Sequence, residues 1–204
     1  MDHTLPPAEE LLRRARAGDD DALGRLLESY RGYQALLART QLGRGLHGKV
    51  EPSDLVQEAF LEAHRDFGQF QGQTEGELLA WLRRVLATGL ADQVRRFRGT
   101  RRRDLRLEMR LAADIDRSSQ ALERGLVAPG SSPSARAERR EDARRLADAL
   151  ERLPADYRDV LLLRHFQGLS FPEIARRLDK TLDAVKNVWL RGLGRLRRTL
   201  EAEA

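Results

Sequence analysis

Apolar residues recur three or four positions apart along most of the chain, while the alternating Val, Ile and Thr runs that mark strands are lacking. This pattern predicts an all-α fold made of two small helical domains. The expected helices cover residues 8–17, 19 to beyond 30, 52–67, 75–98, 134–150, 154–166, 171–178 and 181 onward, with a short helix near 105–113.

The last two predicted helices have the clearest boundaries. Ser170 can cap the first of them, with Glu173 three residues later as its capping-box partner and Pro172 in the first turn, where a missing N–H is tolerated. This helix ends near Leu178, and Thr181 can cap the next. Two helices joined by a three-residue turn predict a helix-turn-helix, whose second helix enters the major groove of DNA.

The second helix of this pair has two faces. Its apolar stripe, expected to face the core, consists of Val185, Trp189, Gly192 and Leu196. The residues expected to contact DNA are Lys180, Thr181, Asp183, Lys186, Asn187, Leu190, Arg191 and Arg195. Lys and Arg donate to guanine, Asn pairs with adenine, and an apolar side chain can contact a thymine methyl. Simple solvation of a charged face, or packing of Leu190 on a neighbouring helix, is the alternative.

Charge distribution says more than net charge, which is only +5. Residues 83–110 contain ten arginines and three acids, and residues 175–198 contain eight Lys or Arg and two Asp. Two separate basic segments suit a polyanion contacted at two places. The absence of cysteine excludes disulfides and thiolate metal sites. With no apolar run near 18 residues and no signal-peptide pattern, we expect a soluble, cytoplasmic protein without membrane insertion.

Three motifs in order carry a family resemblance: DLVQEAFLEAHRDFGQF at 54–70, AWLRRVLATGLADQVRRFRG at 80–99 and LPADYRDVLLLRHFQGLSFPEIARRL at 153–178. Together they resemble extracytoplasmic-function (ECF) sigma factors of the sigma-70 family. The resemblance implies a sigma-2-like domain at 8–99, a linker at 100–134 and a sigma-4-like domain at 135–200. The Pro, Gly and Ser content of 128–134 independently favours a linker.

The resemblance also implies partners and roles. Core RNA polymerase would be contacted at its β′ clamp and β flap, promoter DNA at the minus-ten and minus-thirty-five elements, and an anti-sigma protein would be a further partner. Clamp binding is implied for Asp54, Gln57, Glu58, Phe60 and Leu61. Minus-ten binding is implied for Arg83, Arg84, Thr88, Asp92, Arg95, Arg96 and Arg98, with the loop 67–74 holding flipped bases. The eight helix-turn-helix residues above would bind the minus-thirty-five element.

The residues themselves support part of these roles. On helical spacing, Leu55, Ala59, Glu62 and Ala63 cannot all share one buried stripe with Phe60, which predicts a partner-facing side. Acids that merely favour a helix amino terminus are the alternative. In the helix at 75–98, we expect Trp81, Leu82, Val85 and Leu86 in the core and the arginines outside.

This chain departs from the family pattern at three positions. Family members commonly have Asn where Thr88 stands, which leaves the base preference there open. Gly192 and Gly194 replace the usual Ala and basic residue in the recognition helix. Gly192 either permits close backbone approach or makes the helix fray early.

Other function classes are weaker. The four histidines lie far apart, and neither an HExxH motif nor a phosphate-cradling glycine loop is present, so we expect no catalytic site, metal site or cofactor. A helix-turn-helix transcriptional regulator without sigma activity is the main alternative, although such a protein would not need the motifs at 54–70 and 80–99. A purely helical interaction protein is the third candidate.

Overall fold

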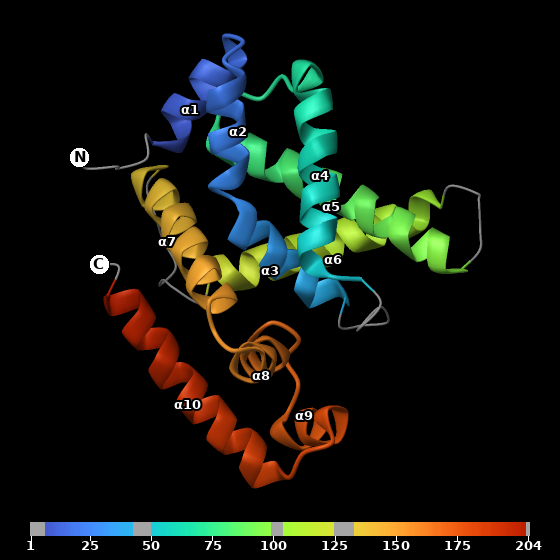
Figure 1. Ribbon diagram of the computed structural model, residues 1–204, viewed down its shortest axis with the longest axis vertical. Coiled ribbons are helices and arrows are strands. Elements are labelled where there is room, and N and C mark those ends of the chain that lie inside the picture. The colour runs from blue at the N-terminus through green and yellow to red at the C-terminus, as the bar shows by residue number, and fades with distance from the viewer. Residues whose placement is uncertain (1–6, 43–49, 99–103, 125–132, 203–204) are drawn as a thin grey trace. The chain divides into compact units, whose positions relative to one another are not determined.

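The computed structural model describes residues 7–42, 50–98, 104–124 and 133–202, and every regular element within these ranges is helical (Figure 1). The predicted all-α fold is therefore confirmed. The elements are α1 (Ala8–Arg16), α2 (Asp20–Glu28), α3 (Arg31–Leu42), α4 (Pro52–Asp66), η1 (Phe67–Gln69), α5 (Glu75–Arg98), α6 (Leu105–Arg124), α7 (Pro133–Glu151), α8 (Ala155–His165), α9 (Phe171–Leu178) and α10 (Leu182–Glu201).

The chain divides into two compact units, which we call the amino-terminal unit (Met1–Asp116) and the carboxy-terminal unit (Arg117–Ala204). Their boundary falls inside the segment 100–134 that the sequence assigns to a linker. The short helix predicted at 105–113 is wrong in extent, because α6 continues to Arg124. None of the helices in the described ranges is both long and apolar enough to cross a bilayer.

A tight junction between α1 and α2 begins the amino-terminal unit. Gly18 adopts a φ of +93°, a left-handed conformation that side chains resist, so glycine suits this turn. Asp19 then caps α2 by accepting from the Ala22 N–H at 2.9 Å, and Arg14 pairs with the same carboxylate at 2.6 Å. The predicted boundary between a helix at 8–17 and a second helix that starts from 19 is confirmed.

The second predicted helix is in fact two helices. α2 ends at Glu28 and α3 begins at Arg31, so the described residues between 8 and 98 contain five α-helices where the sequence predicts four. Tyr30 lies at the junction, is buried, and donates from its hydroxyl to Glu75 of α5 at 2.6 Å. This hydrogen bond ties the bend between α2 and α3 to the start of α5.

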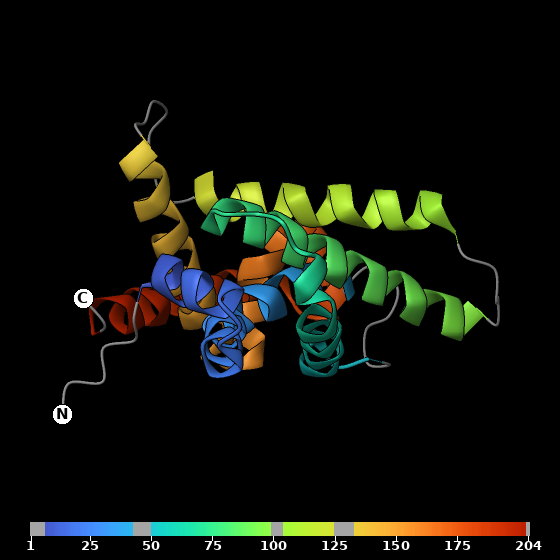
Figure 2. The same ribbon diagram turned by 90° about the horizontal axis from the view of Figure 1, so that it is seen from above.

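Leucines of α1 to α5 make up most of the core of the amino-terminal unit. Those that are almost fully buried are Leu11, Leu12, Leu26, Leu36, Leu37, Leu55, Leu78, Leu82, Leu86 and Leu90. α4 packs against both α3 and α5. The first part of α6, up to Asp116, runs back beside α5 (Figure 2).

In the carboxy-terminal unit, α8, α9 and α10 enclose a second, smaller core. Its buried members are Val160, Leu163, Ile174, Ala175 and Val185, with Leu169, Phe171, Leu178, Val188 and Trp189 packed around them. The short α9 and the long α10 meet at a sharp turn (Figure 1).

Candidate nucleic-acid interface

The turn between α9 and α10 has the capping chemistry predicted from the sequence. The Ser170 hydroxyl and backbone N–H donate to the Glu173 carboxylate at 2.6 and 2.8 Å, and these two hydrogen bonds, the hydroxyl first, lower the pKa of that carboxyl. Asp179 ends α9 in the left-handed region at φ 51°, which Asp tolerates better than most residues. Thr181 then accepts from the Ala184 N–H at 3.2 Å and starts α10.

α10 is sorted into a buried and an exposed side. Val185 and Gly192 of the predicted core stripe are buried, while Trp189 and Leu196 are partly buried. All eight residues predicted to contact DNA are exposed: Lys180, Thr181, Asp183, Lys186, Asn187, Leu190, Arg191 and Arg195. Leu190 is 59% exposed, so it does not pack on a neighbouring helix. Early fraying of α10 is also wrong, because the helix continues to Glu201.

A set of ring contacts braces α10 against α8 and α9. The Trp189 Nε1–H donates to His165 Nε2 at 3.1 Å, and the same indole meets the Phe171 ring edge-on at 5.4 Å between centroids. The Arg164 guanidinium lies 4.9 Å from the Phe171 ring centroid and donates to the Leu169 carbonyl at 3.0 Å. Burial, and then the nearby Arg164 charge, lower the pKa of His165, which favours the neutral ring that can accept from Trp189.

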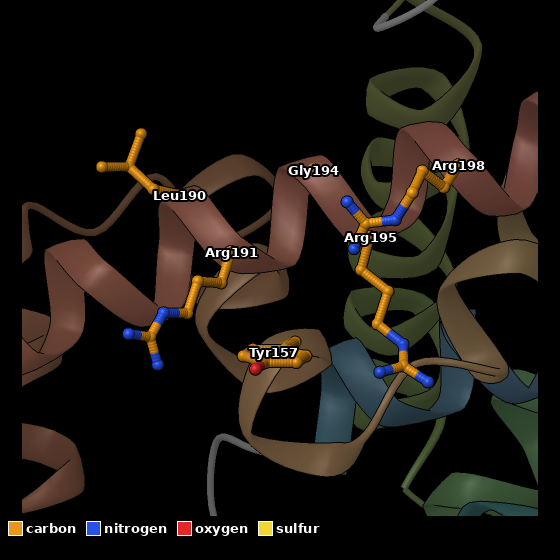
Figure 3. Close-up of a pocket in the computed structure, with 6 residues that line it drawn as sticks. All are labelled: Tyr157, Leu190, Arg191, Gly194, Arg195 and Arg198. Atoms are coloured by element: carbon orange, nitrogen blue, oxygen red, sulfur yellow. The ribbon is translucent and has the colours of Figure 1, made fainter.

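The exposed residues of α10 do not all point the same way. Leu190 projects away from α8, whereas Arg191 and Arg195 descend on the two sides of Tyr157 of α8 (Figure 3). Sequence reasoning grouped these residues on one DNA-reading face. In the structure, Leu190, Arg191 and Arg195 also line a pocket beside Tyr157 of α8.

The loop from 67 to 74 is held by contacts that the sequence did not reveal. The rings of Phe67, Phe70 and Trp81 form a cluster with centroid separations of 5.2 to 6.2 Å. Trp81, predicted to be core, is only partly buried, as is Phe70. A Cβ at Gly72 would collide with the Phe70 ring, so glycine is needed for the loop to pass over it.

Two charged side chains hold the second half of this loop. Glu77 accepts from the N–H groups of Gln73 and Thr74 and from the Thr74 hydroxyl at 2.9 to 3.0 Å. These bonds, the one from Gln73 foremost, lower the pKa of Glu77. Arg16 of α1 donates to the carbonyls of Gln71 and Gly72. The result is a preformed loop with aromatic rings at its base.

The arginines of α5 differ from the prediction that all of them point outward. Arg83 pairs with Asp116 of α6 at 2.6 Å, and its side chain is only 18% exposed. Arg95 pairs with Asp92 and, at 3.6 Å, with Glu108 of α6. The prediction is wrong for these two arginines because the α6 carboxylates lie against α5.

The other predicted minus-ten residues have mixed positions. Arg84 is exposed, and Arg96 is exposed and lies 3.7 Å from Glu58. Thr88 is partly buried, and its hydroxyl donates a hydrogen bond to the Arg84 carbonyl. Arg98 belongs to α5, but its side chain lies outside the described residues.

On α4, four of the five predicted polymerase-binding residues are exposed: Asp54, Gln57, Glu58 and Leu61. Leu61 is 62% exposed, which is unusual for a large apolar side chain. Phe60 is only 9% exposed, and its ring lies 5.5 Å from the Arg31 guanidinium. Leu55, Ala59, Phe60 and Ala63 share the buried stripe of α4, whereas Glu62 lies outside it, so the five residues do not all share one stripe.

Among the described residues, no three His, Cys, Asp or Glu side chains are grouped as metal ligands. The described residues instead present exposed cations, partly exposed aromatic rings and a capped recognition helix. These features define a helical DNA-binding protein of the helix-turn-helix class.

Comparisons with known proteins place this class in a family. The family model for sigma-70, region 4, matches residues 143–196. The ECF RNA polymerase sigma factor BldN of Streptomyces coelicolor is 32% identical over 197 residues, which are 96% of this chain and 66% of BldN. The RNA polymerase sigma-H factor of Pseudomonas aeruginosa is 28% identical over 180 residues, covering 88% of this chain and 86% of that protein. The chain belongs to the ECF sigma factors of the sigma-70 family.

A solved complex of RsbN and BldN is also similar, at 25% sequence identity, covering 92% of this chain and 97% of that one. The TM-score between the two chains is 0.32.

Proposed function

We propose that this protein is a sigma subunit that brings core RNA polymerase to particular promoters and starts strand opening. The observation that carries the proposal is that one chain of this family exposes both an apolar and acidic surface on α4 and a braced recognition helix, α10. A DNA-binding regulator would need only α10. The chain's partners in this proposal are core polymerase and promoter DNA, its place is the cytoplasm, and it performs no catalysis of its own.

The polymerase-docking surface consists of Asp54, Gln57, Glu58 and Leu61 on α4, and its target is the β′ clamp. Leu61 supplies apolar area that water otherwise contacts, and burying a leucine of this kind contributes about 1.5 to 3 kcal/mol. The acids around it give the surface a charge that selects a basic partner. Phe60 supports this surface from below and does not belong to it.

Minus-ten contacts are assigned to the loop 67–74 with the half-exposed rings of Phe70 and Trp81, together with Arg84 and Arg96. Stacking of a base on an aromatic ring contributes roughly 1 to 3 kcal/mol. Loss of a duplex stacking step costs roughly 1.4 kcal/mol. One or two captured bases can therefore nucleate opening, but a long bubble requires the polymerase.

Minus-thirty-five contacts are assigned to the amino-terminal half of α10, where Lys186, Asn187 and Leu190 are exposed together. Each well-formed bidentate contact discriminates between bases by about 1 to 3 kcal/mol. Replacement of Lys186 by Ala should therefore weaken one promoter class selectively. Uniform loss across unrelated sequences would identify that lysine as a phosphate contact.

An anti-sigma protein is a further proposed partner. It is supported by the relative BldN, which is 32% identical to this chain and is solved in complex with RsbN. The apolar and charged surfaces proposed to bind polymerase and DNA are the ones such a protein would cover.

Run-off transcription on a library of genomic fragments tests the proposal. Core polymerase with this chain should start at a defined set of promoters, and Leu61→Gln should weaken both polymerase binding and transcription. Leu105→Gln is the matched control, because Leu105 is 60% exposed but lies on α6. Equal effects of the two substitutions would contradict docking through α4. Transcription that needs another sigma factor would favour the helix-turn-helix regulator.

A further inference from the structure

A pocket lies between the carboxy-terminal half of α10 and α8, within the carboxy-terminal unit. It has a volume of about 440 Å³ and is lined by Tyr157, Leu190, Arg191, Gly194, Arg195 and Arg198. Figure 3 shows Arg191 and Arg195 on either side of the Tyr157 ring and the Arg198 side chain above, near Gly194. The three arginines recur at intervals of four and three residues, so they lie along one side of α10.

Two glycines of α10 shape this pocket. A Cβ at Gly192 would lie 3.3 Å from Tyr157 Cβ and 3.4 Å from Leu161 Cδ1, so the glycine lets α8 approach closely and sets Tyr157 beside the arginines. Gly194 has no such packing constraint, because a Cβ there would meet only Arg198 Nη1 at 4.0 Å. Its missing side chain leaves the pocket open between Arg191 and Arg198.

The pocket has a large local excess of positive charge. Within the part of the chain that the structure describes, no carboxylate pairs with the guanidinium groups of Arg191, Arg195 and Arg198, whereas neighbouring Arg197 pairs with Glu201 at 2.6 Å. Three cations that line one pocket repel one another, and an anion bound between them would relieve that repulsion. Guanidinium groups match phosphate oxygens with paired donors better than any other side chain.

We propose that this pocket binds the phosphate chain of a nucleoside oligophosphate, with the base against the Tyr157 ring. Pockets of about 300 to 1,000 Å³ hold ligands of this size. Three guanidinium groups offset most of the negative charge of a triphosphate, and the ring offers a stacking face for the base. This ligand is separate from the bases read by Lys186 and Asn187.

The site has a consequence for DNA binding that depends on the proposed function. Leu190, Arg191 and Arg195 belong both to the pocket lining and to the residues predicted to contact the minus-thirty-five element. A bound nucleotide therefore competes with promoter DNA for them. Direct nucleotide binding, by contrast, needs neither DNA nor polymerase and is the primary test.

The test is calorimetric titration of the full chain with inorganic triphosphate, GTP and guanosine at near-physiological salt. Triphosphate and GTP should bind, guanosine alone should not, and stacking should make GTP bind about fivefold more tightly than triphosphate. Substitution of Arg195 or Arg198 by Gln should weaken the binding of triphosphate and of GTP by about tenfold each. Arg197→Gln, the matched control, removes one charge from the same helix outside the pocket and should have little effect.

Two further variants separate binding from folding. Gly194→Glu places a carboxylate among the arginines and replaces a helical glycine, so it should abolish triphosphate binding while leaving the unit at least as stable. Tyr157→Leu should remove the preference for GTP and keep triphosphate binding. Retention of triphosphate affinity by Gly194→Glu, or equal losses with Arg197→Gln and Arg195→Gln, would overturn the proposal.

The same phosphate chemistry could come from a DNA strand, and a second titration distinguishes the two sources. It uses a duplex of unrelated sequence with the same variants. If triphosphate fails to bind the wild type while Arg195→Gln and Arg198→Gln weaken the duplex uniformly, the pocket holds the DNA backbone and the nucleotide proposal is wrong. Failure of transcription with intact triphosphate binding would instead count against the proposed function alone.

Discussion

At the residue scale, the Thr181 hydroxyl fixes where α10 begins by accepting from the Ala184 N–H. We expect Thr181→Ala to lower the free energy of unfolding of the carboxy-terminal unit by about 1 kcal/mol, because one helix-start N–H loses its acceptor. Thr181→Ser keeps the acceptor and should have a much smaller effect. Urea denaturation followed by Trp189 fluorescence measures both, and equal losses would contradict the capping role.

Gly192 and Gly194 should respond in opposite directions to a larger side chain. Gly192→Leu forces α10 away from Tyr157 and Leu161, and we expect a loss of about 1 to 3 kcal/mol from overpacking. Gly194→Ala adds a methyl group in open space and should gain about 0.5 to 1 kcal/mol from helix propensity. Denaturant midpoints compare them, and a gain at Gly192 would show that the close approach is not needed.

His165 should make the carboxy-terminal unit sensitive to acid. Its pKa in the folded state is lowered by burial and by Arg164, so the unfolded chain takes up the proton first. The contribution of neutral His165 to the free energy of unfolding is complete above about pH 6.5. It is lost as the pH falls from there toward the lower pKa of the folded state. His165→Gln, whose side-chain oxygen still accepts from Trp189, should remove this dependence. Denaturant midpoints at about pH 5.5 and 7.5 check it, and an unchanged pH slope in the variant would refute it.

Single residues were predictable from sequence where their role is local. Ser170, Thr181 and Gly18 act on backbone groups within a few residues, so their positions in the sequence were enough. Arg83 was misjudged because its ion-pair partner, Asp116, comes from another helix 33 residues further along the chain.

At the element scale, α6 changes which arginines of α5 are paired with carboxylates. It runs beside α5 and pairs its carboxylates with Arg83 and Arg95, which sequence reasoning had given to DNA. We expect a double-mutant cycle of Arg83→Gln and Asp116→Asn to give a coupling energy of about 1 kcal/mol. This value is at the upper end for ion pairs near the surface, because the Arg83 side chain is largely buried.

A companion measurement separates stability from DNA binding along α5. Arg84→Gln, at an exposed position, should weaken binding of single-stranded minus-ten DNA with little change in stability. Arg83→Gln should mainly lower stability. If Arg83→Gln weakens DNA binding more than Arg84→Gln at equal stability, then α6 leaves Arg83 accessible to DNA.

Helix boundaries, like single residues, were predictable where the residues that mark them are local. The ends of α9 and α10 were predicted closely, because caps and turn residues mark them. The break between α2 and α3 and the continuation of α6 to Arg124 were missed. Tyr30 stabilises the first through Glu75 of α5, and no local residue marks either boundary.

At the scale of the whole molecule, the two tryptophans lie in different units, Trp81 in the amino-terminal and Trp189 in the carboxy-terminal unit. Each unit has its own core, so we expect two separable unfolding transitions. Thr181→Ala should shift the transition seen by Trp189 in the Trp81→Phe background. It should leave the transition seen by Trp81 in the Trp189→Phe background unchanged. Parallel shifts would mean that the chain unfolds as one cooperative body.

The helical class and the capped helix-turn-helix follow from the order of the amino acids, because helical spacing and short-range hydrogen bonds act between neighbours in the chain. Three ordered motifs add the family. Which charges are free depends instead on how the helices pack. Arg83 and Arg95 pair with carboxylates of α6, while Arg191, Arg195 and Arg198 line one pocket with Tyr157. Whether a cation is paired depends on which distant carboxylate folds within a few ångströms of it, and no local pattern records that distance.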